Sequence, residues 1–122
     1  MAIPKVIGKK AKEAVGGRYS GVAFQRAAAT NNFTDNFYDL GFRPEQIYIE
    51  NVSGDGILEV TFAHSIQYPI NDNGKFNVDG PTDVTVYSEI DPMTSRIFRM
   101  RDHQLIALKV SSGSSTFRIE AW

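Results

Sequence analysis

Residues 82–122 read TDVTVYSEIDPMTSRIFRMRDHQLIALKVSSGSSTFRIEAW, with apolar and polar side chains alternating in four short runs. Turn residues separate the runs, among them Asp91-Pro92 and the serine–glycine segment 111–115. Such alternation is typical of strands, because successive side chains point to opposite faces of a sheet. The last run continues to Trp122, so we expect the C-terminus to lie within a sheet. The residues predicted to face inward from the last two runs are Ile106, Leu108, Val110, Phe117, Ile119 and Ala121.

A hairpin is predicted upstream of this stretch. Residues 46–52 alternate, with the two isoleucines on one face and Tyr48 and Glu50 on the other. The segment Ser53-Gly54-Asp55-Gly56 supplies two glycines for a tight connection. Residues 57–64 follow as the second strand. In it we expect Leu58, Val60 and Phe62 inward and Glu59 and Thr61 outward.

Weaker strand patterns complete an all-β body. They lie at 19–29 and 36–42, with a brief edge strand at 75–78 inside the loop-like segment 65–81. Seven to eight short strands at intervals of about 8–12 residues predict an antiparallel β-sandwich or jelly roll. We assign residues 19–122 to this body and residues 1–18 to an extended basic N-terminal arm.

Composition limits the class of protein further. A chain of 122 residues without cysteine is long enough for one domain with its own core, and it has no disulfide framework or thiolate site. The longest apolar runs fall far short of the roughly 18 residues that span a bilayer. The basic start is not followed by an apolar core of signal-peptide length. We therefore expect a protein made in the cytoplasm and not inserted in a membrane.

Charge is distributed unevenly along the chain. Residues 1–26 carry a balance of +5, whereas residues 27–122 carry −6. A basic arm on an acidic body indicates contact with an anionic neighbour. We expect a protein partner, because nucleic acid is an unlikely ligand for so few charges without interleaved aromatic residues. A solvated leader is the alternative. The predicted contact residues of the arm are Lys5, Lys9, Lys10, Lys12 and Arg18.

Nothing in the sequence indicates catalysis. The two histidines, His64 and His103, have no second ligand at metal spacing. No nucleophile-elbow motif marks a serine. Residues 71–74, Asn-Asp-Asn-Gly, resemble the start of a calcium loop but lack the later carboxylate, so a β-turn is the better interpretation. We expect no enzyme activity, no metal and no cofactor.

Two groups in the body are candidate partner-binding residues. Arg99 and Arg101 share a strand face that can meet an acidic partner, or can instead be neutralised by nearby acids on an outer face. The aromatic group Phe37, Tyr38 and Phe42 can stack on sugars or bases. More often such a group closes the end of a barrel or packs on a neighbouring subunit.

The segments FRPEQIYIEN (42–51) and GILEVTF (56–62), followed by the terminal RIEAW, resemble small virion proteins of tailed bacteriophages. The likeness covers residues 42–62 and 96–122 and is one of strands and turns. It implies a β-sandwich that decorates or cements a capsid shell, forms a homo-oligomer and binds the major capsid protein within the virion. Tail, neck or fibre-attachment components of the virion and a carbohydrate-binding sandwich are the alternatives. Deletion of residues 1–18 is predicted to leave the body folded and to abolish assembly.

Overall fold

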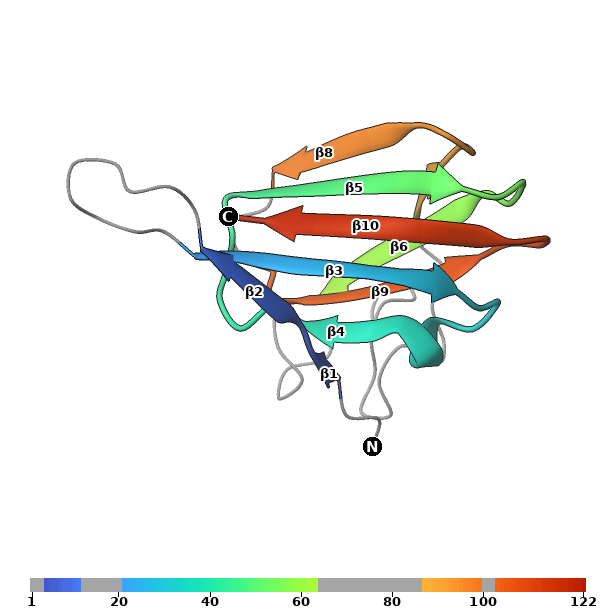
Figure 1. Ribbon diagram of the computed structural model, residues 1–122. Helices are drawn as coiled ribbons and strands as arrows, with labels where there is room; N and C mark the ends of the chain where they lie inside the picture. The colour runs from blue at the N-terminus through green and yellow to red at the C-terminus, as the bar shows by residue number, and fades with distance from the viewer. Residues whose placement is uncertain (1–3, 12–20, 64–86, 100–102) are drawn as a thin grey trace.

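The computed structural model describes residues 4–11, 21–63, 87–99 and 103–122. Their strands form two five-stranded sheets that face each other (Figure 1). Sheet A has the strand order β1-β4-β9-β6-β7, and sheet B has the order β2-β3-β10-β5-β8. The strands are β1 (Lys5–Val6), β2 (Gly8–Ala11), β3 (Gly21–Ala29), β4 (Phe37–Asp39), β5 (Gln46–Ser53), β6 (Leu58–Ala63), β7 (Ser88–Ile90), β8 (Ser95–Arg99), β9 (Leu105–Val110) and β10 (Ser115–Ala121), and a short 3-10 helix, η1 (Phe33–Asn36), precedes β4.

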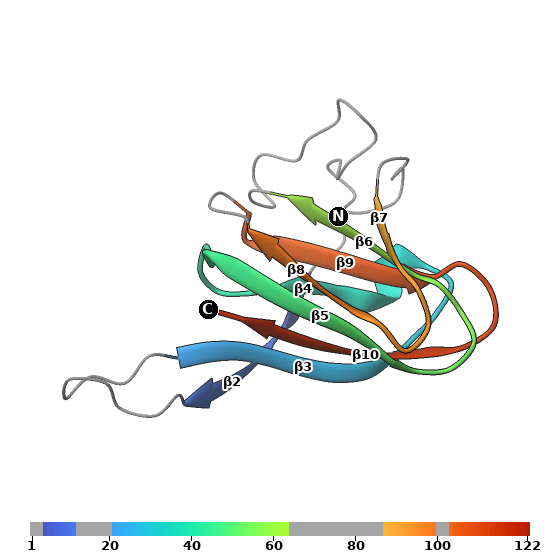
Figure 2. The ribbon, with the colours of Figure 1, turned by 90° about the horizontal axis from the view of Figure 1, so that it is seen from above.

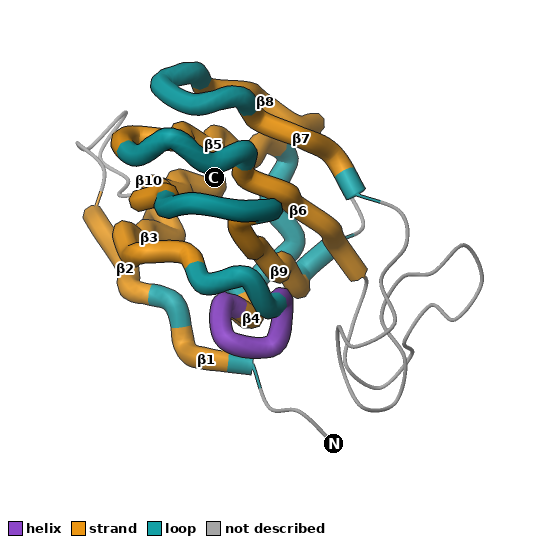
Figure 3. Tube along the Cα trace, turned by 90° about the vertical axis from the view of Figure 1, so that its right-hand side faces the viewer, coloured by secondary structure: helices purple, strands orange, loops and turns teal. Residues whose placement is uncertain are grey.

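The predicted fold class, an all-β antiparallel sandwich, is confirmed. Strands β3 to β10 supply the eight strands expected of the body. Figure 2 looks at the sandwich from above and shows the two layers, while Figure 3 shows η1 beside β4 at one end. The predicted strand at 75–78 lies outside the described residues.

The C-terminal strand lies inside sheet B, as its alternation predicts. β10 pairs antiparallel with β3 on one side and with β5 on the other. The ladder reaches the last residue, because the backbone N–H of Trp122 donates to the carbonyl oxygen of Gln46 at 3.0 Å. Main-chain pairing on both sides therefore fixes this end of the chain.

The core fills the space between the sheets. Its side chains come from the inward positions of both sheets, so the alternation of β5, β6, β9 and β10 is confirmed. Burying one such aliphatic or aromatic side chain contributes about 1.5–3 kcal/mol. The fully buried members from the paired central strands are Ile47, Ile49, Leu58, Val60, Ile106, Leu108, Phe117, Ile119 and Ala121.

The N-terminal segment needs a correction. β1 pairs in parallel with β4, and β2 pairs antiparallel with β3, so residues 5–11 form one edge of each sheet. Between them Ile7 is 2% exposed and belongs to the core. This part of the chain is therefore not an extended arm. Edge strands tolerate lysine and need only backbone pairing, which explains why their sequence lacks an alternating signal. Residues 12–18 lie outside the described residues.

The outer face of sheet A is also covered. Glu59 and Thr61 point away from the core, as predicted, but both are buried. Glu59 forms an ion pair with Lys109 on the neighbouring strand β9, at 3.7 Å between the carboxylate oxygen and Nζ. Alternation shows the face on which a side chain lies, and it does not show what packs against that face.

Candidate interaction surface

The outer face of sheet B is open, in contrast to that of sheet A. Strand register places one residue from each of four adjacent strands in a row across it. Residues directly opposite each other share a face of the sheet. Three members of the row are aromatic or aliphatic, and Ile97 at the sheet edge is 55% exposed. The row consists of Phe24, Glu120, Tyr48 and Ile97.

A second row runs parallel to the first and holds most of the charge. It contains Arg26, Arg118, Glu50 and Ser95 from the same four strands. The guanidinium of Arg118 lies 3.0 Å from a carboxylate oxygen of Glu50 and 5.5 Å from the ring centre of Tyr48. The Tyr48 hydroxyl donates to the same carboxylate at 3.2 Å. These contacts hold three side chains in one arrangement at the centre of the face.

The arginine at this centre stays charged. The hydrogen bond with Tyr48, together with the negative charge of Glu50, raises the pKa of Arg118 above its already high ordinary value. The guanidinium therefore stays protonated at every pH at which the protein is folded. Pairs of this kind contribute little to stability in water, so their consequence is mainly the shape and charge of the surface.

Two more arginines on the same face flank the paired centre. Arg26 and Arg99 are exposed, and within the described part of the chain neither forms an ion pair. Arg96 on edge strand β8 belongs to the other face, because it lies opposite the core residue Ile49, and its guanidinium carbon is 5.0 Å from the ring centre of Phe98. The described outer face of sheet B therefore carries an excess of positive charge at its two sides.

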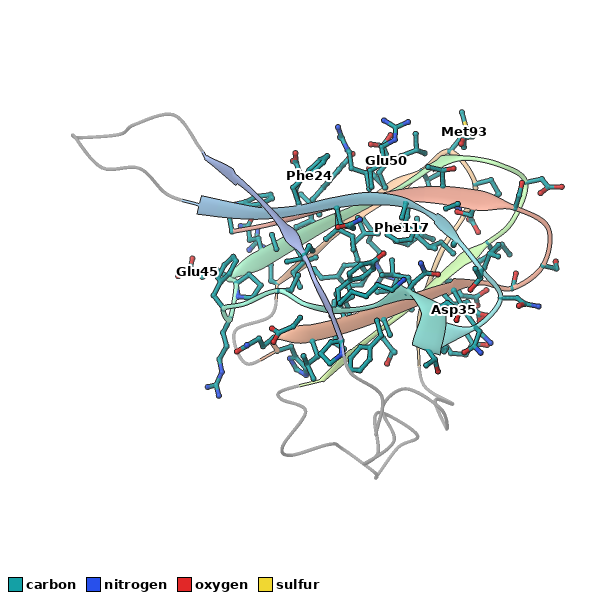
Figure 4. The ribbon with its side chains drawn as sticks, turned by 60° about the horizontal axis from the view of Figure 1, so that its bottom comes forward. Phe24, Asp35, Glu45, Glu50, Met93 and Phe117 are labelled. Atoms are coloured by element: carbon teal, nitrogen blue, oxygen red, sulfur yellow. The ribbon has the colours of Figure 1, made fainter. Side chains whose placement is uncertain are left out.

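The turn between β7 and β8 adds an exposed apolar side chain. Met93 is 72% exposed and has a φ of 63°. The N–H of Thr94 donates to the carbonyl oxygen of Asp91 at 3.2 Å, so residues 91–94 form a β-turn. A positive φ at the third position of such a turn normally selects glycine. Figure 4 shows Phe24, Glu50 and Met93 on one side of the sandwich, with Phe117 between the sheets.

Of the predicted arm residues, three lie in the described part of the chain. Lys5 is in β1, where its ammonium donates to the carbonyl oxygen of Asp35 at 2.6 Å. Lys9 and Lys10 are in β2, the edge strand of sheet B. Lys12 and Arg18 lie outside the described residues. These lysines belong to sheet edges, and their role in partner binding stays a prediction.

The body candidates divide into two groups. Arg99 lies on β8 opposite Gln46 and is exposed, whereas Arg101 is outside the described residues. Phe37 and Tyr38 are 1% and 3% exposed, so the interpretation of these two as partner-binding residues is wrong. Phe42 is half-buried and packs against the core.

The aromatic group around β4 is part of the protein interior. The rings of Tyr38 and Phe117 meet edge to face at 6.1 Å. Burial raises the pKa of the Tyr38 phenol, with the hydrogen bond to Asn36 acting in the opposite direction. Several aromatic residues in a loop-like sequence can pack in a core or bind a ligand. Here Phe37 and Tyr38 are buried in the protein.

The described residues contain no group that could hold a metal ion. No three of their histidine or acidic side chains are grouped as metal ligands. His103 is half-buried against the ring of Phe62, with 6.3 Å between ring centres, and His64 lies outside the described residues. None of the described segments is a helix long and apolar enough to cross a membrane.

Most residues of the outer face of sheet B were not predicted from the sequence to form a site. The alternation of residues 46–52 placed Tyr48 and Glu50 outward, but nothing in the sequence showed that β3, β10 and β8 extend the same face around them. A signal was available at Met93, since a bulky residue two positions after Asp91 in an Asp-Pro turn is unusual.

Comparisons with known proteins give no argument about fold or function. No protein-family model matches the chain, and no curated protein shows significant similarity to it. Among solved structures, hydroxypropylphosphonic acid epoxidase from S. wedmorenis aligns with a TM-score of 0.48 and 10% identity. A structure of FeII HppE aligns with a TM-score of 0.48 and 8% identity. In both cases the match covers 83% of this chain and 43% of that chain. At these values the likeness carries no argument about activity.

Proposed function

We propose that this protein is a structural component of a bacteriophage virion, and that it decorates or cements the head by binding to the major capsid protein. The observation that carries the proposal is the open outer face of sheet B, whose central side chains are held by their own contacts. The strand pattern at 42–62 and 96–122, which resembles small phage virion proteins, supplies the biological setting. Homo-oligomerisation is part of this proposal.

Adhesion explains the chemistry of the described residues better than turnover does. Binding costs less when the contacting side chains are ordered beforehand, because less conformational entropy is lost. Arg118, Glu50 and Tyr48 meet this condition through their mutual contacts. A general acid needs a group that releases its proton near neutral pH, and the raised pKa of Arg118 prevents this for the guanidinium at the centre of the face. We therefore propose a binding role without catalysis.

The paired N-terminal strands change which part of the protein is proposed to contact the partner. Lys5 to Ala11 are engaged in the two sheets, so they do not form a free strap around a neighbour. The proposal accordingly assigns the main contact to the sandwich body. The aromatic group that could stack on sugars is Phe37, Tyr38 and Phe42, and two of its three rings, Phe37 and Tyr38, are buried.

The test is to locate and count the protein in purified phage particles. Quantitative mass spectrometry is expected to find it in a fixed ratio to the major capsid protein, in numbers that match sites on the head lattice. Particles that lack it are expected to lose their genome at a lower temperature or after milder osmotic shock. A dozen copies or fewer would assign it to the tail or neck, and its absence from particles would refute the proposal.

A further inference from the structure

We infer that the outer face of sheet B, together with the β7–β8 turn, is the docking surface, and that its partner is a protein surface with carboxylates around an apolar centre. The identity of that partner as a capsid subunit rests on the proposed function. The inference itself adds the face, the residues and the chemistry of the contact.

The first reason is the difference between the two outer faces. On sheet A, residues that point away from the core are nevertheless buried, including Glu59, Thr61 and Phe37. On sheet B, Arg26, Ile97 and Arg99 are exposed. In the described part of the chain, the outer face of sheet A has its exposed residues at the edge strand, at Tyr87 and Glu89, whereas sheet B has exposed residues on both sides of its centre.

The second reason is the apolar centre. Tyr48 and Ile97 are neighbours across β5 and β8, and Ile97 is one of the large hydrophobic side chains exposed in the described residues. Met93 is another, at the turn that leads into the same strand. Aromatic and aliphatic anchors with arginines around them are typical of the energetically important part of a protein interface.

The third reason is charge, which also selects the partner. Arg26 and Arg99 have no carboxylate partner among the described residues, whereas Glu50 is already paired with Arg118. A surface that supplies carboxylates opposite these arginines is therefore favoured. Two copies of this face brought together would add like charges, so a second copy is the poorer partner here. The expected homo-oligomer then uses another surface.

The fourth reason is the conformation of Met93. A residue with a side chain at positive φ costs roughly 1–2 kcal/mol relative to glycine. At this site the side chain gains little from burial, since it is largely exposed. Folding alone therefore favours glycine at position 93. A methionine that is both strained and exposed is explained if its side chain is used in binding.

The experiment uses particles depleted of the protein as the probe, and full-length variants as ligands in a co-sedimentation assay. The double variant Arg26→Glu/Arg99→Glu is expected to lose about tenfold or more in affinity, with a weaker dependence on salt than the wild type. Arg43→Glu reverses an exposed arginine in the β4–β5 connection and is the matched control, expected to bind within about twofold of wild type.

Met93→Gly separates binding from folding. It is expected to raise the melting temperature by about 3–6 °C, because it relieves the turn, and to lower affinity several-fold. Wild-type affinity in both the double variant and Met93→Gly would overturn the inference and leave the proposed function intact. Failure of the wild-type protein to bind the particles would overturn the proposed function, and with it the partner assigned here.

Discussion

The hydroxyl of Ser115 donates a hydrogen bond to the side-chain oxygen of Asn51, at 2.5 Å, and both residues are buried. The amide nitrogen of Asn51 donates in turn to the carbonyl oxygens of Gly56, at 2.9 Å, and Ile90, at 3.0 Å. One side chain on β5 thus connects β10, the β5–β6 turn and β7. All of these partners are groups that water cannot reach once the sandwich is closed.

Asn51→Ala is expected to destabilise the protein by about 3 kcal/mol or more, because each buried group left without a partner costs about 1–3 kcal/mol. Urea denaturation measures the change, and Ser53→Ala, at an exposed position on the same strand, is the control. Asn51→Asp replaces the donor with an acceptor and should be no better tolerated at neutral pH. A loss below about 1 kcal/mol for Asn51→Ala would show that the network is dispensable.

The β5–β6 turn and the β9–β10 turn beside it each contain a glycine with a positive φ. Gly54 has a φ of 105°, and a Cβ there would overlap the backbone carbonyl of Ser114. Gly113 has a φ of 74°, but its Cβ would meet only the side chain of Asp55. Gly54→Ala is therefore expected to cost more than about 2 kcal/mol and Gly113→Ala about 1 kcal/mol. Thermal unfolding of the two variants gives the ranking, and the reverse order would contradict this account.

Asp55 makes the stability of the turn depend on pH. The backbone N–H of Ser114 donates to its carboxylate at 3.0 Å, and this bond, followed by one from its own N–H, lowers the pKa of Asp55 below 3.8. A carboxyl group with a lower pKa in the folded chain stabilises the fold above its unfolded pKa. That contribution is lost as the pH falls through the folded pKa.

The wild type is therefore expected to unfold at a higher temperature than Asp55→Asn at neutral pH, with the difference shrinking below about pH 4. Differential scanning calorimetry over a series of acidic buffers measures this difference. If the difference in unfolding temperature between the wild type and Asp55→Asn stays constant with pH, the carboxylate charge at position 55 does not contribute to the stability of the turn.

The sequence was most informative where a strand has two chemically distinct faces. β5 and β10 alternate, so their inward residues could be predicted. β6 was predicted as a strand, but the burial of its second face could not be, because that depends on what packs against sheet A. Phe37 and Tyr38 were ambiguous for the same reason: an aromatic residue is suited equally to a core and to a binding surface.

The open face of sheet B could not be predicted from sequence because it is assembled from four strands that are distant in the chain. Arg26, Arg118 and Glu50 become neighbours only through the order β3-β10-β5. Arg99 was identified as a candidate from its own strand, without the residues that surround it. A site of this kind depends on topology, and local pattern carries no information about it.

The N-terminal strands provide the sharpest test of the fold. Ile7 lies in the core between β1 and β2, so Ile7→Ala is expected to destabilise the protein by about 2–4 kcal/mol. Lys5→Ala, which removes only a surface hydrogen bond, should cost less than about 0.5 kcal/mol. Deletion of residues 1–11 should destabilise the protein more than either substitution does, because it also exposes the edges of β3 and β4. Urea denaturation of the three proteins measures these effects, and wild-type stability in the deletion would mean that the segment is an arm after all.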